Sequence, residues 1–292
     1  MMPHAEHVSP LPERVPAQTE LQARAQWVCW RYEERNGKRT KVPYNPQTGM
    51  PARSNDPATW ASYQQVCAAC EQEPTRYTGV GFVFHQDYTG LDLDHCVRSD
   101  GSIDRWAQDI LDRLASYAEY SPNDGVHVFL RGTVPAGLRR PLSFAPHAEA
   151  ALEMYCQGRY LTITGRHVPG TPLVMQEVTS EVQAVVADMG LLEQAATSRN
   201  GEKFRALWQG DTTGYLSASE ADQALCNLLA FWTGNNMARV DRLFRISGLY
   251  RPEKWERAAR AGETYGQGTI ARACQQKDLA GEESVRKARR SG

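Results

Sequence analysis

Two aspartates separated by one residue, Asp92 and Asp94, are the part of this sequence whose spacing points most directly to chemistry. They alternate with Leu91 and Leu93, a pattern that predicts a β-strand with both carboxylates on one face. Two carboxylates on one face repel each other unless a cation lies between them, and hard oxygen ligands of this kind suit Mg²⁺ or Mn²⁺. The alternative interpretation is an exposed strand face that carries two ordinary acids.

Other polar residues favour the metal interpretation. Glu153 shares a strand face with Tyr155 by the same alternation, so it can supply a third carboxylate from a neighbouring strand. His127 follows a Ser-Pro-Asn-Asp-Gly loop that begins at Ser121, where backbone N–H groups and a hydroxyl can hold phosphate. Arg159 follows the turn after Glu153 and offers a bidentate partner for phosphate. Carboxylates for metal, with imidazole and guanidinium for a triphosphate, are the groups that nucleotidyl transfer needs.

Tyr160, which follows Arg159, has two interpretations. Its ring could stack on the sugar or base of a nucleotide, or exclude a 2′-hydroxyl. An aromatic residue at this spacing can equally belong to the hydrophobic core. The sequence leaves both open.

The elements that must position these residues follow from the hydrophobic pattern. We expect a hairpin of strands 27–32 and 40–44 around an Asn36-Gly37 turn, and further strands over 79–84, 91–96, 126–130, 151–155 and 159–164. Helices are expected over 61–72, 103–117 and 174–189. Strands and helices mixed in this order predict an α+β domain.

The chain is expected to divide into four segments. Residues 1–20 are rich in Pro, His and Glu and predict a disordered leader. Residues 21–190 form the predicted catalytic domain, and residues 281–292 a basic flexible tail. Residues 200–280 are predicted to be helical, with helices over 219–232, 237–247, 252–260 and 268–277.

Charge is distributed unevenly, although the formal net charge is only -1. Residues 200–292 hold 15 Lys and Arg against 11 Asp and Glu, so the remainder of the chain is acidic. Within the helical segment Arg245, Arg251 and Lys254 lie near the aromatic Trp255. Cations that hold phosphates beside rings that stack on bases make a surface for single-stranded DNA. The alternative is a solvated helix face.

The seven cysteines are odd in number and scattered, which indicates reduced thiols and a cytoplasmic location. Cys67 and Cys70 form a CxxC pair without a second pair at zinc spacing, so we interpret them as small buried residues. No apolar run approaches the roughly 20 residues that span a bilayer, so no membrane partner is expected. The sequence contains no Walker A loop and therefore no ATP-driven helicase of its own.

Several segments resemble the motifs of phage and plasmid primase-polymerases, which belong to the archaeo-eukaryotic primase superfamily. The three motif-like segments are Gly90-Leu-Asp-Leu-Asp-His95, Ser121-Pro-Asn-Asp-Gly-Val-His-Val-Phe-Leu-Arg-Gly132 and Glu153-Met-Tyr-Cys-Gln-Gly-Arg-Tyr-Leu-Thr-Ile-Thr-Gly165. Segments 30–32 and 41–44 are typical of the N-terminal hairpin of phage members. Segments 204–211, 217–222, 243–251 and 254–255 resemble the helix-bundle domain that accompanies such catalytic domains.

The resemblance implies a catalytic domain with an RRM-like antiparallel sheet, followed by a small all-α helix-bundle domain. It implies that Asp92, Asp94 and Glu153 bind divalent metal and that His127 contacts the phosphates of the incoming nucleotide. The implied function is a primase-polymerase that makes and extends primers on a single-stranded DNA template from dNTPs or rNTPs, in phage- or plasmid-type replication. A replicative helicase is then a candidate partner.

Two other functions use similar residues. An acidic cluster with a histidine also serves metal-dependent nucleases, although a dedicated triphosphate site argues against hydrolysis. A replication initiator or DNA-binding module without catalysis is the other alternative, and the intact set of acids with His127 argues against it.

Overall fold

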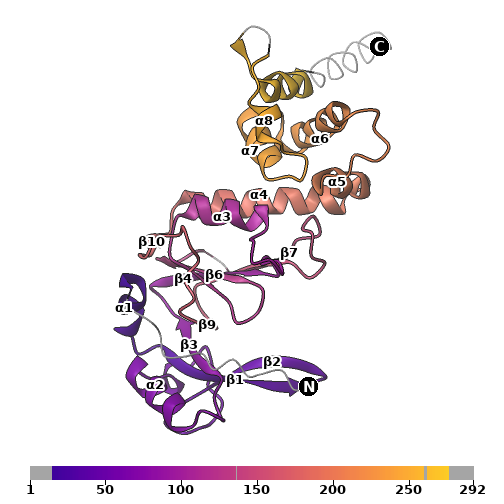
Figure 1. Cartoon of the computed structure of the whole chain (residues 1–292). Coiled ribbons are helices and arrows are strands. Elements are labelled where there is room, and N and C mark those ends of the chain that lie inside the picture. The colour runs from indigo at the N-terminus through magenta and orange to yellow at the C-terminus, as the bar shows by residue number, and fades with distance from the viewer. Residues whose placement is uncertain (1–14, 136, 260–261, 276–292) are drawn as a thin grey trace, which may run out of the picture. The chain divides into compact units, whose positions relative to one another are not determined.

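The computed structural model describes residues 15–135, 137–259 and 262–275, which fall into two compact units (Figure 1). The first unit contains the described residues up to Pro141 together with Glu149–Gln183. The second contains Leu142–Ala148 and the described residues from Ala184 onward. Strands and helices are both present and most strand pairs are antiparallel, so the predicted α+β class is confirmed.

Four antiparallel strands form the smaller sheet of the first unit, in the order β2-β1-β3-β9. Their bounds are β1 Trp27–Arg35, β2 Lys38–Tyr44, β3 Gly79–Phe84 and β9 Arg159–Ile163. Asn36 and Gly37 connect β1 to β2 with φ values of 53° and 71°. A two-residue hairpin turn of this kind needs positive φ at both positions, which Asn-Gly tolerates well. The predicted hairpin is therefore confirmed.

The larger sheet has the strand order β10-β6-β4-β8-β7, with β5 also pairing with β6. Its strands are β4 Tyr88–Asp94, β5 Ala118–Tyr120, β6 Val126–Arg131, β7 Leu138–Pro141, β8 Ala151–Tyr155 and β10 Gln176–Glu177. Strand β4 begins at Tyr88 rather than at Leu91, because Tyr88 and Thr89 also pair with β6. It ends before His95, whose φ of 54° leaves the extended conformation. Strand β7 carries no alternating pattern and was not predicted; pairing with β8 makes it a strand.

Three α-helices of the first unit begin or end where local chemistry dictates. They are α1 Pro16–Gln22, α2 Tyr63–Gln72 and α3 Arg105–Leu114, with a short 3₁₀ turn, η1, at Pro57–Thr59. Helix α2 starts after Ser62, whose hydroxyl and backbone form a capping box with Gln65, so it begins two residues later than predicted. Helix α3 stops where Ala115 turns left-handed at φ 42°, short of the predicted end at residue 117.

Helix α1 corrects the predicted leader over residues 15–20. Pro16 occupies the first helical position, where its missing N–H costs nothing. Ala17 and Leu21 are almost fully buried, so this segment packs into the core instead of remaining disordered. Residues 1–14 lie outside the described residues.

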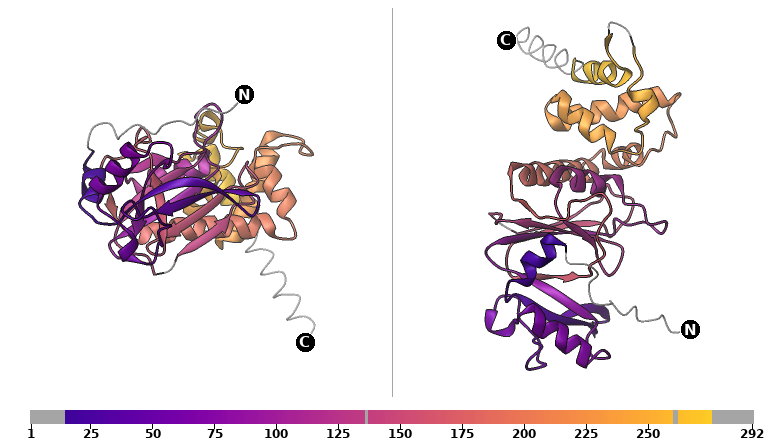
Figure 2. Two further views of the ribbon diagram at one scale, coloured as in Figure 1. Left: turned by 90° about the horizontal axis from the view of Figure 1, so that it is seen from below. Right: turned by 60° about the vertical axis from the view of Figure 1, so that its left-hand side comes forward.

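One apolar cluster joins the two sheets. The smaller sheet contributes residues such as Trp27, Phe82 and Phe84, and the larger sheet contributes Tyr88 and Phe129. The rings of Phe84 and Phe129 stack with their centroids 6.0 Å apart. Helix α2 adds Val66 to the same cluster, and Figures 1 and 2 show this helix against the smaller sheet. Burial of each such side chain stabilises the fold by about 1.5–3 kcal/mol, so the cluster fixes one sheet against the other.

The second unit is helical. Its elements are α4 Ser180–Thr197, which starts at the end of the first unit, α5 Gly201–Trp208, α6 Ala218–Thr233, α7 Met237–Arg245, α8 Pro252–Trp255 and a helical stretch over 265–275. The helix predicted over 174–189 is displaced toward the C-terminus, because Gln176 and Glu177 pair with β6 as β10.

The boundary expected between residues 190 and 200 falls inside α4, since Leu192 and Ala195 continue the buried face of Val185 and Met189. The predicted tail at 281–292 lies outside the described residues. Across the described part of the chain, no helix combines the length and the apolar character needed to cross a bilayer.

A fully buried carboxylate, Glu119 on β5, ties several elements of the first unit together. Its oxygens accept hydrogen bonds from Gln18 Nε2 at 3.0 Å and from the hydroxyl of Tyr117. They also accept from the backbone N–H groups of Thr164 at 2.9 Å and Gly165 at 3.1 Å. Helix α1, strand β5 and the segment after β9 therefore meet at one side chain.

We predict that Glu119→Ala lowers the thermal unfolding midpoint, because it leaves buried N–H groups without an acceptor. The expected loss is about 2–4 kcal/mol, which corresponds to a midpoint lower by roughly 5–12 °C. Differential scanning calorimetry measures the shift. Glu34→Ala, an exposed acid on β1, is the control and should change stability by less than about 0.5 kcal/mol. An unchanged midpoint for Glu119→Ala would show that the network does not stabilise the fold.

Candidate active site

Five charged or titratable residues, each from a different strand, form one row across the larger sheet. In the strand order β5-β6-β4-β8-β7 they are Glu119, His127, Asp92, Glu153 and Arg139. Directly paired residues of antiparallel strands project from the same face of a sheet. The register therefore places Asp92 between His127 and Glu153, which brings together three residues that the sequence assigned to one site. We call this set the charged row.

Asp94 lies two residues beyond Asp92 on β4 and so projects from the same face. Its neighbour on β8 is Ala151. On its other side lies Gly125, where an added Cβ would meet the carbonyl oxygen of Leu93 at 2.7 Å and the Cα of Asp94 at 3.5 Å. Both neighbours of Asp94 are thus small, and the close approach at residue 125 requires glycine.

The electrostatics of this face favour a bound cation. Burial and the nearby carboxylate of Glu153 raise the pKa of Asp92 to about 7. Burial and the carboxylates of Asp92 and Glu153 raise the pKa of Asp94 to about 7. Lys41 on β2 opposes these shifts, and burial lowers the pKa of Lys41 itself. Among the described residues, the buried Oδ1 of Asp92 has no hydrogen-bond partner. An unpartnered carboxylate oxygen beside two further acids fits a divalent metal such as Mg²⁺ or Mn²⁺.

His127 is buried and neutral. Burial, and after it the positive charge of Lys41, lower its pKa to about 4. Its Nδ1 lies 3.0 Å from the carbonyl oxygen of Thr162 on β9, so Nδ1 carries the hydrogen and donates it. Its Nε2 then has a free lone pair and lies 3.5 Å from Oδ1 of Asp92. Because the imidazole is neutral, this contact is not an ion pair at neutral pH.

Both carboxylate oxygens of Glu153 are engaged. Oε1 lies 2.7 Å from Nε of Arg139, and Oε2 accepts a hydrogen bond of 2.6 Å from the hydroxyl of Tyr155. The guanidinium of Arg159 lies over the ring of Tyr155, 5.1 Å from its centroid. Arg159 therefore reaches the charged row through Tyr155, and its side chain is exposed to solvent.

The hydroxyl of Ser121 forms hydrogen bonds within its own loop, and its contact with a phosphate stays a prediction. Its hydroxyl is buried and accepts hydrogen bonds from the backbone N–H groups of Asn123 at 3.3 Å and Gly125 at 3.1 Å. These bonds hold the loop before β6 in shape. The outer side of the loop contacts the hairpin, since Tyr32 donates to Oδ1 of Asn123 at 3.1 Å.

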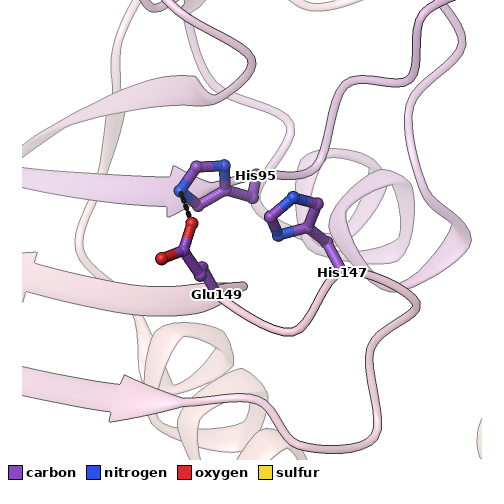
Figure 3. Close-up of side chains that lie close together, drawn as sticks. All are labelled: His95, His147 and Glu149. Atoms are coloured by element: carbon purple, nitrogen blue, oxygen red, sulfur yellow. Dashed lines mark ion pairs between the residues drawn. The ribbon is translucent and has the colours of Figure 1, made fainter.

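His95 connects the end of β4 to this loop and to the segment just before β8. Its Nδ1 lies 2.9 Å from Oδ2 of Asp124, and its Nε2 lies 3.8 Å from Oε2 of Glu149 (Figure 3). The backbone of His95 is left-handed, with φ of 54°, where β4 ends. His95 thus helps to position Asp94, its neighbour in the chain.

Tyr160 lies mainly in the core, the less specific of its two interpretations. Its ring packs against the cluster of Val28, Trp60 and Val83. It also covers Gly81, where an added Cβ would meet Cδ2 of the ring at 2.6 Å. Among the described residues, the buried hydroxyl of Tyr160 has no hydrogen-bond partner.

In the second unit, the structure corrects the predicted DNA-stacking role of Trp255. Its ring is only 2% exposed and stacks on Phe244 with centroids 3.8 Å apart. Its Nε1 donates to Oδ1 of Asp241 at 2.8 Å. A ring enclosed in this way cannot also stack on a base.

The three cations predicted to bind DNA are each paired with acids. Arg251 and Lys254 both lie 2.7 Å from the carboxylate of Asp222, which is 1% exposed. Arg245 lies 2.7 Å from Asp241 and also pairs with Glu256. These contacts assign the cations a structural role, and contact with DNA stays a prediction for them.

A pocket in the second unit combines rings and cations that the sequence analysis did not single out. Its volume is about 540 Å³, and its lining includes Arg199, Lys203, Phe204, Phe231 and Trp232. Phe231 is 54% exposed although it is large and apolar. The lining residues come from 195–204 and 224–232, and no local pattern shows that these two segments face each other.

The sequence did not place two further residues, Lys41 and Arg139, beside the acids of the candidate site. Lys41 alternates with Val42 on β2, a pattern compatible with a solvated face, so only the packing of the hairpin reveals its position near the acids. Arg139 belongs to the strand that carries no strand pattern. Its register opposite Glu153 is a property of the sheet and leaves no mark in the local sequence.

Comparison with known proteins gives two matches. The family model of the NrS-1 polymerase HBD domain matches residues 218–280. The DNA primase-polymerase of Nitratiruptor phage NrS-1 is 34% identical over 278 residues, which cover 89% of this chain. The aligned region spans 37% of the length of that relative.

We predict that these two aspartates make the protein without divalent metal less stable as pH rises from about 4 to about 7. The pKa values of Asp92 and Asp94 are raised in the folded state, so their contribution to stability is complete below about pH 4 and is lost as pH rises through about 7. Added Mn²⁺ should restore the thermal unfolding midpoint at about pH 8, because a bound cation stabilises the ionised carboxylates.

The double variant Asp92→Asn/Asp94→Asn is the test. It should reduce both the dependence on pH and the stabilisation by Mn²⁺. A double variant that keeps the Mn²⁺ shift of the unsubstituted chain would place the metal elsewhere.

Proposed function

Because the chain belongs to the family of phage primase-polymerases, we propose that it is a DNA-dependent nucleotidyltransferase that starts and extends primers on single-stranded DNA. One observation carries the proposal. The register of the larger sheet brings Asp92 and Glu153 side by side next to His127, with Asp94 on the same face. Three acids and an imidazole on one face match the needs of nucleotidyl transfer.

In this proposal Asp92, Asp94 and Glu153 hold Mg²⁺ or Mn²⁺. A metal bound by these residues would polarise a phosphate as a Lewis acid and lower the pKa of the attacking hydroxyl. The protein supplies a partly buried site in which Asp92 and Asp94 both have raised pKa values and therefore gain most from a cation.

His127 and Arg159 hold the triphosphate of the incoming nucleotide. The Nδ1 hydrogen of His127 is occupied by Thr162, so its Nε2 can donate to a phosphate only when the imidazole is protonated. A triphosphate anion favours that protonation, because an adjacent negative charge raises the pKa of histidine. The exposed guanidinium of Arg159 can move from the ring of Tyr155 onto a phosphate.

The remaining parts of the proposal concern the choice between dNTPs and rNTPs, the contact with the template strand and the fold of each unit. The unpartnered hydroxyl of Tyr160 is a candidate for contact with the sugar, where it would help to choose between dNTPs and rNTPs. The ring- and cation-lined pocket around Phe231 is a candidate contact for the template strand. We further propose that the first unit has an RRM-like arrangement, that the second is a helix-bundle domain, and that the protein works in the cytoplasm beside a replicative helicase.

We predict that Asp92→Ala/Asp94→Ala abolishes synthesis on single-stranded DNA while template binding persists. The assay incubates the chain with an unprimed or primed template, Mn²⁺ and labelled dNTPs or rNTPs, and product length is measured on a gel. Asp100→Ala, an exposed acid outside the charged row, should retain activity. Longer products support polymerisation, shorter products would indicate a nuclease, and binding alone would indicate a module without catalysis. Extension by the double variant would refute the assignment of these aspartates.

We predict that His127→Ala raises the KM for the nucleotide by about 10- to 100-fold and weakens template affinity much less, because a hydrogen bond to a charged group is lost. His127→Asn is a second variant that can keep the donor to Thr162 and so separates phosphate binding from packing. His167→Ala serves as the control, since the ring of His167 stacks on Tyr117 and its Nε2 contacts the hydroxyl of Thr171, outside the proposed nucleotide site. An unaltered KM in His127→Ala would remove this residue from the nucleotide site.

A further inference from the structure

We propose that Arg139 is a positioning residue that occupies Glu153 when no metal is bound and competes with the metal for that carboxylate. This inference rests on the proposed function, in which Glu153 is a metal ligand. It concerns a residue at the end of the charged row that none of the sequence motifs contains.

The register and the contact both point to this role. Arg139 lies directly opposite Glu153 in the antiparallel pair of β7 and β8, so the two side chains share a face. Its Nε lies 2.7 Å from Oε1 of Glu153, the distance of a charge-assisted hydrogen bond. The row thus ends in a cation that touches the outermost of its acids.

The arrangement leaves Glu153 without a free oxygen for a metal. Tyr155 donates to Oε2, while Arg139 holds Oε1. Tyr155 is a neutral donor, and a carboxylate oxygen can accept its hydrogen bond and coordinate a cation at the same time. A guanidinium beside a divalent cation is repelled, so Arg139 is the partner that must leave.

The exposure of the two side chains makes this exchange feasible. Arg139 is 74% exposed, whereas Glu153 is 16% exposed. The guanidinium can therefore move into solvent with little loss, while the carboxylate stays where β8 places it. Lys41 lies near Asp92 and Asp94, and Arg139 contacts Glu153. In the protein without metal, each of the three acids therefore has a cation nearby.

The expected size of the competition follows from the strength of such pairs. Exposed ion pairs favour their bound geometry by a factor of roughly 1.5 to 5. Removing Arg139 should therefore strengthen metal binding by about two- to fivefold, because the metal no longer displaces a competitor. A role confined to holding the sheet together would leave metal affinity unchanged or reduce it.

The experiment measures Mn²⁺ binding to the full chain by electron paramagnetic resonance of the free ion. Arg139→Ala should lower the Kd for Mn²⁺ by about two- to fivefold. Arg140→Ala is the matched control, since Arg140 is the next residue on β7, pairs with Leu152 and projects from the opposite face. Arg140→Ala also removes one positive charge, and it should change the Kd for Mn²⁺ less than Arg139→Ala does. Thermal unfolding of each variant confirms that it is folded.

A double-mutant cycle decides between direct competition and a general effect of charge. In a Glu153→Gln background, Arg139→Ala should no longer change the Kd, because the contested carboxylate is gone. An equal gain in that background would overturn the proposal, as would an unchanged or weaker affinity in Arg139→Ala alone. If the unsubstituted chain binds no Mn²⁺, the proposed function fails together with this inference. If it binds Mn²⁺ and Arg139→Ala has no effect, only the inference fails.

Discussion

Negative charge concentrated on one face of an antiparallel sheet is the constraint on which the rest of this structure depends. The pairing of β4 with β8 sets Asp92 against Glu153, and the alternation along β4 adds Asp94. Ionised acids so close to one another and so poorly solvated oppose folding, which is visible in the raised pKa values of both aspartates. The fold tolerates them because strand pairing and the apolar cluster between the sheets hold the backbone in place.

The surroundings of these acids are arranged to limit that cost without removing it. Lys41 approaches from the hairpin and Arg139 from the edge strand, while His127 stays neutral between Asp92 and Glu119. None of these groups forms a hydrogen bond with the buried Oδ1 of Asp92. A site that is partly compensated in this way keeps a preference for a small, highly charged ligand, and it remains folded before that ligand arrives.

Local patterns predicted the central part of the site well. Alternation marked β4, β8 and β9, and the Asn-Gly pair marked the hairpin, so the strands that carry Asp92 and Glu153 were found from sequence. The roles that the sequence did not predict correctly are set by tertiary contacts. Trp255 looks like a stacking platform until its burial against Phe244 is known, and the role of Arg139 follows from a pairing that its own sequence does not signal. The hydrogen bonds that the hydroxyl of Ser121 accepts inside its loop also depend on the folded structure, and the sequence does not predict them.

The contact between His127 and Thr162 has a consequence for how this site can vary. The acceptor is the main-chain carbonyl, so any side chain at position 162 that fits the core leaves the imidazole tautomer intact. A one-residue insertion or deletion in β9 has the opposite effect, because it shifts every carbonyl along the strand and presents an N–H or nothing to Nδ1. This contact therefore tolerates substitutions at position 162 but no insertion or deletion in β9. The Nδ1 hydrogen of His127, which lies on the larger sheet, thus constrains the number of residues between Glu153 on β8 and the end of β9 on the smaller sheet.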